Sequence, residues 1–138
     1  MTLLKKQPER DYSHRALIDK LGVKEISRVS VVGVDDKEFF RQLHDRASDV
    51  FIGDPVLESD FIFYSADSTT ELKRLRTLKK FIKSNGAIWV VSLKGKLAKI
   101  RDVDVIKAAK TAGLVDNKVV GFSETHTSLK LVIPVAKR

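Results

Sequence analysis

The stretch Arg28-Val29-Ser30-Val31-Val32-Gly33-Val34-Asp35-Asp36 decides the fold of this chain. Its valines form the β-branched run that is typical of a central strand in a parallel sheet, buried on both faces. The next residues, Asp35-Asp36-Lys37-Glu38, have the N-cap and N3 pattern of a capping box, and they predict a helix with Asp35 as its cap. A buried strand that leads directly into a helix indicates an α/β domain.

The flanking sequence repeats this alternation of strand and helix. Further strands are predicted at residues 50–52, 60–65, 87–93, 119–122 and 129–133. Helices are predicted at residues 12–21, 35–47, 68–84 and 102–112. Ser68 is the expected cap of the third helix, and Gly22 and Gly113 are placed to end the first and the last. The pattern predicts a three-layer α/β sandwich with a mostly parallel sheet of about six strands and a C-terminal antiparallel hairpin.

Composition favours one domain over residues 1–138, with residues 1–10 as a loose, polar N-terminal arm. The apolar stretch at residues 87–93 is too short to cross a bilayer, and the N-terminus has no signal-like apolar segment, so we expect a cytoplasmic protein. The chain has no cysteine, which excludes disulfides and thiolate chemistry. Its three histidines have no ligand spacing, so no metal site is expected.

The net charge of +8 would attract nucleic acids, acidic proteins or phosphorylated small molecules. The predicted helix at 68–84 carries four cations at three- and four-residue steps, which are Lys73, Arg76, Lys80 and Lys83. On one helical face they would form a stripe able to track phosphates. Long basic side chains also cover apolar helix flanks and keep a protein soluble, so both interpretations stay open.

Ligands of an open α/β sheet bind outside the carboxyl ends of the strands. The residues predicted at that rim are Asp35, Asp36, Asp54, Tyr64, Ser65, Asp67, Lys94, Lys96, Glu124 and His126. Lys94 and Lys96 flank a glycine at a strand end and could hold a phosphate or carboxylate, or form a solvated loop. Glu124 and His126 lie two residues apart in the last turn, and could transfer a proton if that turn bends toward the rim.

The order of elements resembles the Rossmann-like S-adenosylmethionine-dependent methyltransferases. The stretches that carry this likeness are Leu21-Gly22-Val23-Lys24, Lys83-Ser84-Asn85-Gly86-Ala87-Ile88-Trp89-Val90-Val91 and Ala112-Gly113-Leu114. In that family an Asn-Gly or Pro-Gly step leads into the fourth or fifth strand, and an antiparallel last strand closes the sheet. The chain also resembles a small bacterial family of unknown function with this fold, through Asp11-Tyr12-Ser13, Ala112-Gly113-Leu114-Val115-Asp116-Asn117-Lys118-Val119 and Glu124-Thr125.

The methyltransferase resemblance implies S-adenosylmethionine as cofactor. The residues that it implies as cofactor-binding are Gly33, Asp35, Asp54 and Ser65. Two departures stand out: the glycine-rich first loop is replaced by Gly33-Val34-Asp35-Asp36, and an edge strand with its helix is missing after Ile52. Asp54 lies 21 residues after Gly33, where such families place a carboxylate for ribose hydroxyls. An Asp before a proline is also a common turn residue.

Three functions are compatible with these features. The first is a degenerate methyltransferase-fold domain that binds a small polar or nucleotide-like ligand without catalysis. The second is an active S-adenosylmethionine-dependent methyltransferase with an atypical cofactor loop. The third is an electrostatic module for nucleic acid or an acidic protein. The first two require a pocket framed by Gly33, Asp54 and Ser65, whereas the third requires a stripe that continues to Lys94 and Lys96.

Overall fold

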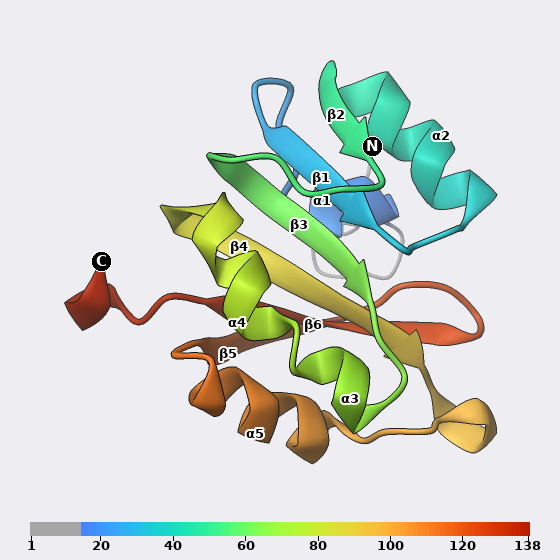
Figure 1. Ribbon diagram of the computed structural model, residues 1–138. Coiled ribbons are helices and arrows are strands. Elements are labelled where there is room, and N and C mark those ends of the chain that lie inside the picture. Colours follow the sequence, from blue (N-terminus) through green and yellow to red (C-terminus); the bar gives the residue numbers. More distant parts are fainter. Residues whose placement is uncertain (1–14) are drawn as a thin grey trace, which may run out of the picture.

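The computed structural model describes residues 15–138, so the predicted N-terminal arm and the Asp11-Tyr12-Ser13 stretch lie outside the described residues (Figure 1). Six strands form one sheet, in the order β2-β1-β3-β4-β6-β5. Their bounds are β1 (Arg28–Val32), β2 (Asp49–Ile52), β3 (Ser59–Ser65), β4 (Ile82–Leu93), β5 (Val115–Gly121) and β6 (His126–Val132). The first four strands pair in parallel, and β6 runs antiparallel to both β4 and β5. The predicted mostly parallel sheet with a C-terminal hairpin is confirmed.

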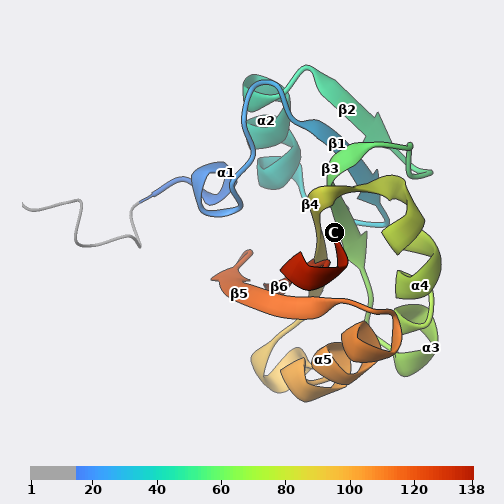
Figure 2. The same cartoon turned by 90° about the vertical axis from the view of Figure 1, so that its left-hand side faces the viewer.

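Helices cover both faces of the sheet (Figures 1 and 2). Their bounds are α1 (Leu17–Lys20), α2 (Lys37–Arg46), α3 (Thr69–Leu72), α4 (Leu75–Leu78) and α5 (Asp102–Thr111), with 3₁₀ turns at Lys79–Phe81, Gly95–Leu97 and Val135–Lys137. The core on the α1 and α2 side is built around Phe39, Phe63 and Trp89. The core on the side of α3, α4 and α5 includes Leu72 and Leu75. No helix among residues 15–138 combines the length and the apolar character that a membrane span requires.

The start of α2 differs by one residue from the prediction. Asp36 is the cap: its backbone is extended and its carboxylate accepts the N–H of Phe39 at 2.9 Å. Asp35, the predicted cap, is exposed before the helix. The expected cap at Ser68 is confirmed, because its hydroxyl accepts the N–H of Glu71. Capping therefore explains Asp36 and leaves the Asp35 carboxylate free of that role.

The predicted helix at residues 68–84 is wrong. In its place the chain forms α3, which ends at Leu72, and α4, which begins at Leu75. The 3₁₀ turn at Lys79–Phe81 follows, and β4 begins at Ile82. Ile82 pairs with Ser59 in the sheet, and the Lys83 ammonium lies 3.1 Å from a carboxylate oxygen of Asp60. These contacts come from residues far away in sequence, and they override the local helical pattern of residues 82–84.

The closing hairpin is longer than predicted, because β5 begins at Val115 and β6 at His126. The register of β6 with β4 runs from Val132 against Ala87 to His126 against Leu93, so polar residues of the predicted turn pair as strand. The first predicted helix is reduced to α1 within the described residues, and Gly22, which follows the C-cap Leu21, has a φ of 82°. That left-handed conformation is the one predicted for this glycine.

Candidate ligand site at the strand rim

A small cavity lies at the carboxyl ends of β1, β3 and β4, where the sequence predicted a site. Its volume is about 140 Å³, and it is lined by Val34, Asp35, Asp36, Ser65, Val91, Phe122, Thr125 and His126. The loop after β1 supplies the two carboxylates, and Ser65 is the last residue of β3. The β5–β6 turn supplies Thr125, and His126 begins β6. The loop after β1 and the end of β3 meet because parallel strands end at one edge. The β5–β6 turn joins them because β6 runs antiparallel to β4, so that the start of β6 lies beside the end of β4.

Gly33 turns the chain out of β1 toward the cavity. Its φ is 84°, a left-handed conformation that side chains with a Cβ rarely adopt. A Cβ built at this position would lie 3.5 Å from the Cβ of Ser65, which is ordinary contact. The glycine is thus required by backbone conformation, and it sets the path of the two aspartates that follow.

The charge of the cavity is negative on its α2 side. In nucleotide-binding α/β proteins, free N–H groups at a helix N-terminus face the phosphate. Here the Asp36 carboxylate accepts the N–H of Phe39, and the backbone oxygen of Asp36 accepts the N–H of Phe40, so neither N–H is free for a phosphate. In the described part of the chain, no Lys or Arg lines the cavity. Two carboxylates, with no cation among the lining residues, disfavour an anion here and favour a positively charged group.

The β5–β6 turn folds over the cavity through its own hydrogen bonds. The Ser123 hydroxyl accepts the N–H of His126 at 3.1 Å, and the Thr125 hydroxyl lies 2.8 Å from His126 Nδ1. Phe122 packs against Phe39 of α2, with ring centroids 5.0 Å apart. The turn is therefore anchored to the rest of the rim, and Thr125 orients the His126 ring.

The structure brings four of the residues predicted at the rim, Asp35, Asp36, Ser65 and His126, to this cavity, with Gly33 beside it. It does not bring Glu124, which is exposed on the turn, so the predicted pair of Glu124 and His126 does not meet there. Sequence reasoning missed Val34, Val91, Phe122 and Thr125. The sequence could have indicated Thr125, because it directly precedes the predicted residue His126 in the polar turn.

The two predicted lysines lie beyond the cavity lining. The backbone N–H of Lys94 donates to the carbonyl of Thr125 at 3.0 Å. The Lys94 ammonium lies 3.9 Å from the position that a Cβ on Gly121 would take. Lys96 is exposed in a 3₁₀ turn. Their role in holding a phosphate or carboxylate stays a prediction.

Tyr64 and Asp67, which were also placed at the rim, have structural roles. The Tyr64 hydroxyl donates to the carbonyl of Glu71 at 2.8 Å, and burial raises the pKa of Tyr64. The Asp67 carboxylate accepts the N–H of Leu93 at 2.8 Å, which ties the end of β4 to the loop before α3. Both side chains support the rim from outside the cavity.

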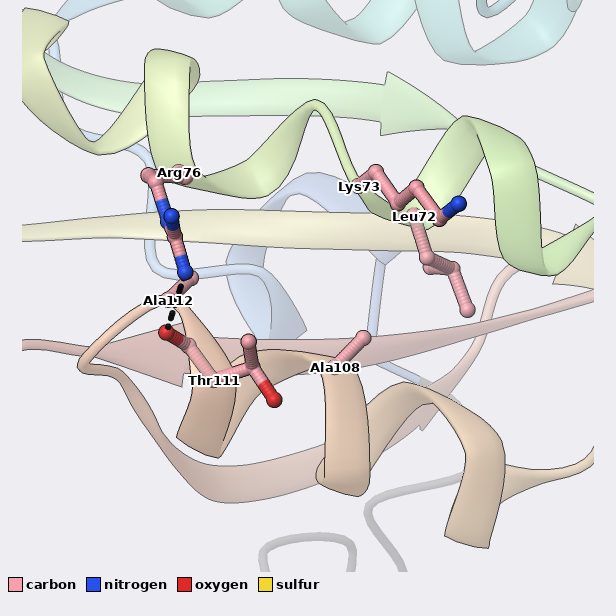
Figure 3. A pocket seen from close by; sticks show the side chains of 6 residues that line it. All are labelled: Leu72, Lys73, Arg76, Ala108, Thr111 and Ala112. Carbon is pink, nitrogen blue, oxygen red and sulfur yellow. Dashed lines mark hydrogen bonds between the residues drawn. The ribbon is translucent and has the colours of Figure 1, made fainter.

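The four predicted polyanion residues do not share one helical face. Lys73 and Arg76 lie beside a groove between α3, α4 and α5 (Figure 3). Lys80 is exposed in the 3₁₀ turn, and Lys83 belongs to β4, where it pairs with Asp60. The continuous stripe depended on the long helix, which the structure replaces by separate turns. Polyanion binding through these residues stays a prediction.

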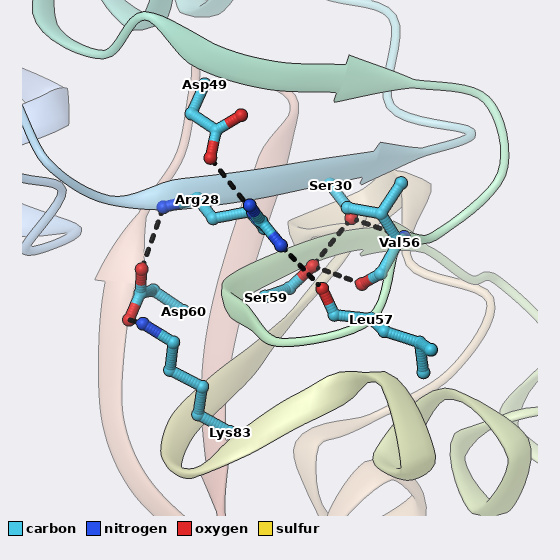
Figure 4. A network of polar contacts seen from close by, with 8 residues as sticks. All are labelled: Arg28, Ser30, Asp49, Val56, Leu57, Ser59, Asp60 and Lys83. Atoms are coloured by element: carbon cyan, nitrogen blue, oxygen red, sulfur yellow. Dashed lines mark hydrogen bonds and ion pairs between the residues drawn. The ribbon is translucent and has the colours of Figure 1, made fainter.

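Asp54 is exposed in the loop between β2 and β3, and it does not line the rim cavity. A buried network holds this loop (Figure 4). The Ser30 and Ser59 hydroxyl oxygens are 2.8 Å apart, Ser30 accepts the N–H of Val56 at 3.0 Å, and Ser59 donates to the carbonyl of Val56. At the other end of β1, Arg28 Nε donates to Asp49 at 2.9 Å. Hydrogen bonds to the sheet therefore anchor Val56, two residues after Asp54.

Solved structures share this arrangement at low sequence identity. A TehB-like S-adenosylmethionine-dependent methyltransferase from Corynebacterium glutamicum is 11% identical with a TM-score of 0.54, and the match covers 91% of this chain and 94% of that one. The CcbJ methyltransferase from Streptomyces caelestis is 8% identical with a TM-score of 0.60, over 85% of this chain and 87% of that one. The fold is that of the Rossmann-like methyltransferases.

A third protein with the methyltransferase fold is fibrillarin from Aeropyrum pernix, whose structure is in complex with natively bound S-adenosylmethionine. It is 15% identical with a TM-score of 0.52, over 79% of this chain and 67% of that one. No family model and no curated protein matches this sequence. At these identities the methyltransferase fold is the property that the chain shares with the three proteins.

Proposed function

We propose that this domain binds a small polar ligand carrying a positive charge at the strand rim, and that it does so without catalysis. The observation that carries the proposal is the cavity lined by Asp35 and Asp36, to which the described residues contribute no opposing Lys or Arg. Ser65, Thr125 and His126 add hydrogen-bonding groups. An ammonium or sulfonium group is the cation that such a lining favours.

The size of the cavity supports binding over catalysis. At about 140 Å³ it is smaller than the roughly 300–1,000 Å³ of sites that enclose a drug-sized ligand. It has room for the sulfonium centre of S-adenosylmethionine, whereas the adenosine and the amino-acid carboxylate would lie outside it. This cavity leaves no further volume for a methyl acceptor beside such a ligand.

An active methyltransferase with an atypical cofactor loop is the second candidate. It is supported by the match with the Corynebacterium glutamicum protein over 91% of this chain. Its sulfonium-bearing cofactor has the charge that Asp35 and Asp36 favour. The two candidates differ in whether bound S-adenosylmethionine is converted to S-adenosylhomocysteine.

Calorimetric titration at physiological salt tests the binding proposal. We expect S-adenosylmethionine to bind more tightly than S-adenosylhomocysteine, which lacks the sulfonium charge. Asp35→Asn should weaken S-adenosylmethionine by about fivefold, since unit charges about 4 Å apart in water interact by about 1 kcal/mol. Glu124→Gln is the matched control, because it removes another exposed carboxylate, one that does not line the cavity.

Two outcomes would overturn the assignment. No heat from either compound at millimolar concentration would exclude this ligand, and equal losses in Asp35→Asn and Glu124→Gln would show that the cavity carboxylates do not form the site. Asp54→Ala tests separately whether the ribose is held at the loop after β2. Release of S-adenosylhomocysteine during incubation with a cell extract, absent with heat-inactivated protein, would favour the enzyme.

A further inference from the structure

A second cavity lies on the opposite face of the sheet, between α3 and α4 on one side and α5 on the other (Figure 3). Its volume is about 440 Å³, and it is lined by Leu72, Lys73, Arg76, Ala108, Thr111 and Ala112. It continues into a hollow of about 250 Å³ that shares three of these residues and adds Thr69, Asp104 and Lys107. The two together form one groove, which we call the α-groove.

The floor of the α-groove is apolar. Leu72 is buried against the sheet, and Figure 3 shows its side chain directed toward Ala108. Ala108 lies on α5, and Ala112 caps the C-terminus of that helix four residues later, so the two lie on one side of it, and their short side chains leave the space open. The space also exists because the helical path is interrupted between Leu72 and Leu75.

Two cationic side chains, Lys73 and Arg76, lie at the edge of this apolar floor. Arg76 donates one hydrogen bond, at 3.3 Å, to the carbonyl of Thr111, and a guanidinium has five N–H donors. Lys73 forms no ion pair among the described residues. The acidic residue of the groove, Asp104, is engaged, since its carboxylate accepts the N–H of Arg101 at 2.8 Å. Lys73, Arg76 and Lys107 outnumber Asp104 among the lining residues, so the local charge that a ligand meets is positive.

We propose that the α-groove binds an amphipathic monoanion, which is a carboxylate with an unbranched apolar body. The body lies over Leu72, Ala108 and Ala112, and the carboxylate pairs with Arg76 and Lys73. The cavity volume falls within the range of about 300–1,000 Å³ typical of small-molecule sites. The bridge from Arg76 to Thr111 closes one end of the groove, which favours a ligand of limited length over a peptide (Figure 3). This site is independent of the rim cavity.

Octanoate is the probe, and 1-octanol is its uncharged counterpart with the same chain length. In a titration of the isotopically labelled full chain followed by nuclear magnetic resonance, we expect octanoate to shift the amides of residues 72–76 and 108–112. The same octanol concentration should shift them at least tenfold less, because hydrogen bonds to charged groups contribute about 1.5–3 kcal/mol. Equal effects of the two compounds, or shifts elsewhere, would overturn the proposal.

Three variants test the geometry. Ala108→Leu fills the floor with a good helix former and should abolish octanoate binding. Lys73→Gln combined with Arg76→Gln should weaken it about tenfold, whereas Lys80→Gln, which removes an exposed charge away from the groove, should leave it unchanged. Retained binding in Ala108→Leu, or equal losses in the lysine control, would refute the site. If Ala108→Leu does not fold, the shift map of the unaltered protein decides.

Discussion

Single hydroxyl groups fix the loop between β2 and β3. Ser30 and Ser59 are both fully buried, and each makes hydrogen bonds with the backbone of Val56 (Figure 4). We expect Ser30→Ala to lower the free energy of unfolding by roughly 1–3 kcal/mol, because it leaves the Val56 N–H and part of Ser59 unpaired in a dry site. Urea denaturation measures this loss.

Ser84→Ala is the control for that prediction, since Ser84 is an exposed serine near the start of β4. It should change the free energy of unfolding by less than about 0.5 kcal/mol. Ser59→Ala should add little to Ser30→Ala, because residues of one hydrogen-bond network are coupled. A Ser30→Ala variant as stable as Ser84→Ala would contradict the role of the network.

At the scale of elements, the start of β4 depends on one glycine. Ser59 pairs with Ile82, yet Phe61 pairs with Ala87, so residues 83–86 bulge out of the ladder. A Cβ on Gly86 would lie 3.0 Å from the carbonyl oxygens of Ser59 and Asp60. We expect Gly86→Ala to lower the free energy of unfolding by roughly 1–3 kcal/mol, as measured by urea denaturation, since backbone must move.

Gly121 offers a matched comparison within a strand. Neither this glycine nor Gly86 has a positive φ, and a Cβ on Gly121 would meet nothing nearer than the Lys94 ammonium at 3.9 Å. Gly121→Ala should therefore be neutral or stabilise the protein by up to about 1 kcal/mol, through reduced freedom of the unfolded chain. Similar losses in the two variants would show that close backbone approach is not the reason for Gly86.

At the scale of the whole molecule, the sheet has a protected centre and two open edges. Among residues 15–138, β3 and β4 have a paired strand on each side, whereas β2 and β5 are paired on one side. The short β2 also exposes Phe51 and Ile52, by 38% and 58%. We expect hydrogen exchange to be slowest in β3 and β4, where it requires global unfolding, and fastest among the strands in β2 and β5.

Protection of β2 as strong as that of β3 would contradict this expectation and would mean that the outer edge of β2 is covered. An unpaired edge is a template for another strand, and a second copy of the chain could supply it. Repeating the exchange measurement at several protein concentrations distinguishes association with a second copy from a cover supplied by the same chain. Protection that rises with concentration identifies association, and constant protection identifies a cover within the chain.

The sequence by itself determined the strand at β1, the caps and stops at Ser68, Gly22 and Gly113, and the alternation that predicts a parallel sheet. These features depend on neighbouring residues, whose hydrogen bonds and backbone preferences act locally. The rule that ligands bind at the carboxyl ends of strands was enough to place Asp35, Ser65 and His126 near one another.

The tertiary structure alone decided the rest. Residues 82–84 become strand because Ile82 pairs with Ser59 in the sheet and Lys83 forms an ion pair with Asp60. Both partners lie more than 20 residues away in sequence. The β5–β6 turn covers the rim because β6 pairs with β4 along its full length, which brings Thr125 to the cavity. The α-groove exists because two interrupted helices face the alanines of α5. Each of these outcomes depends on contacts between distant segments, whose energies no local pattern contains.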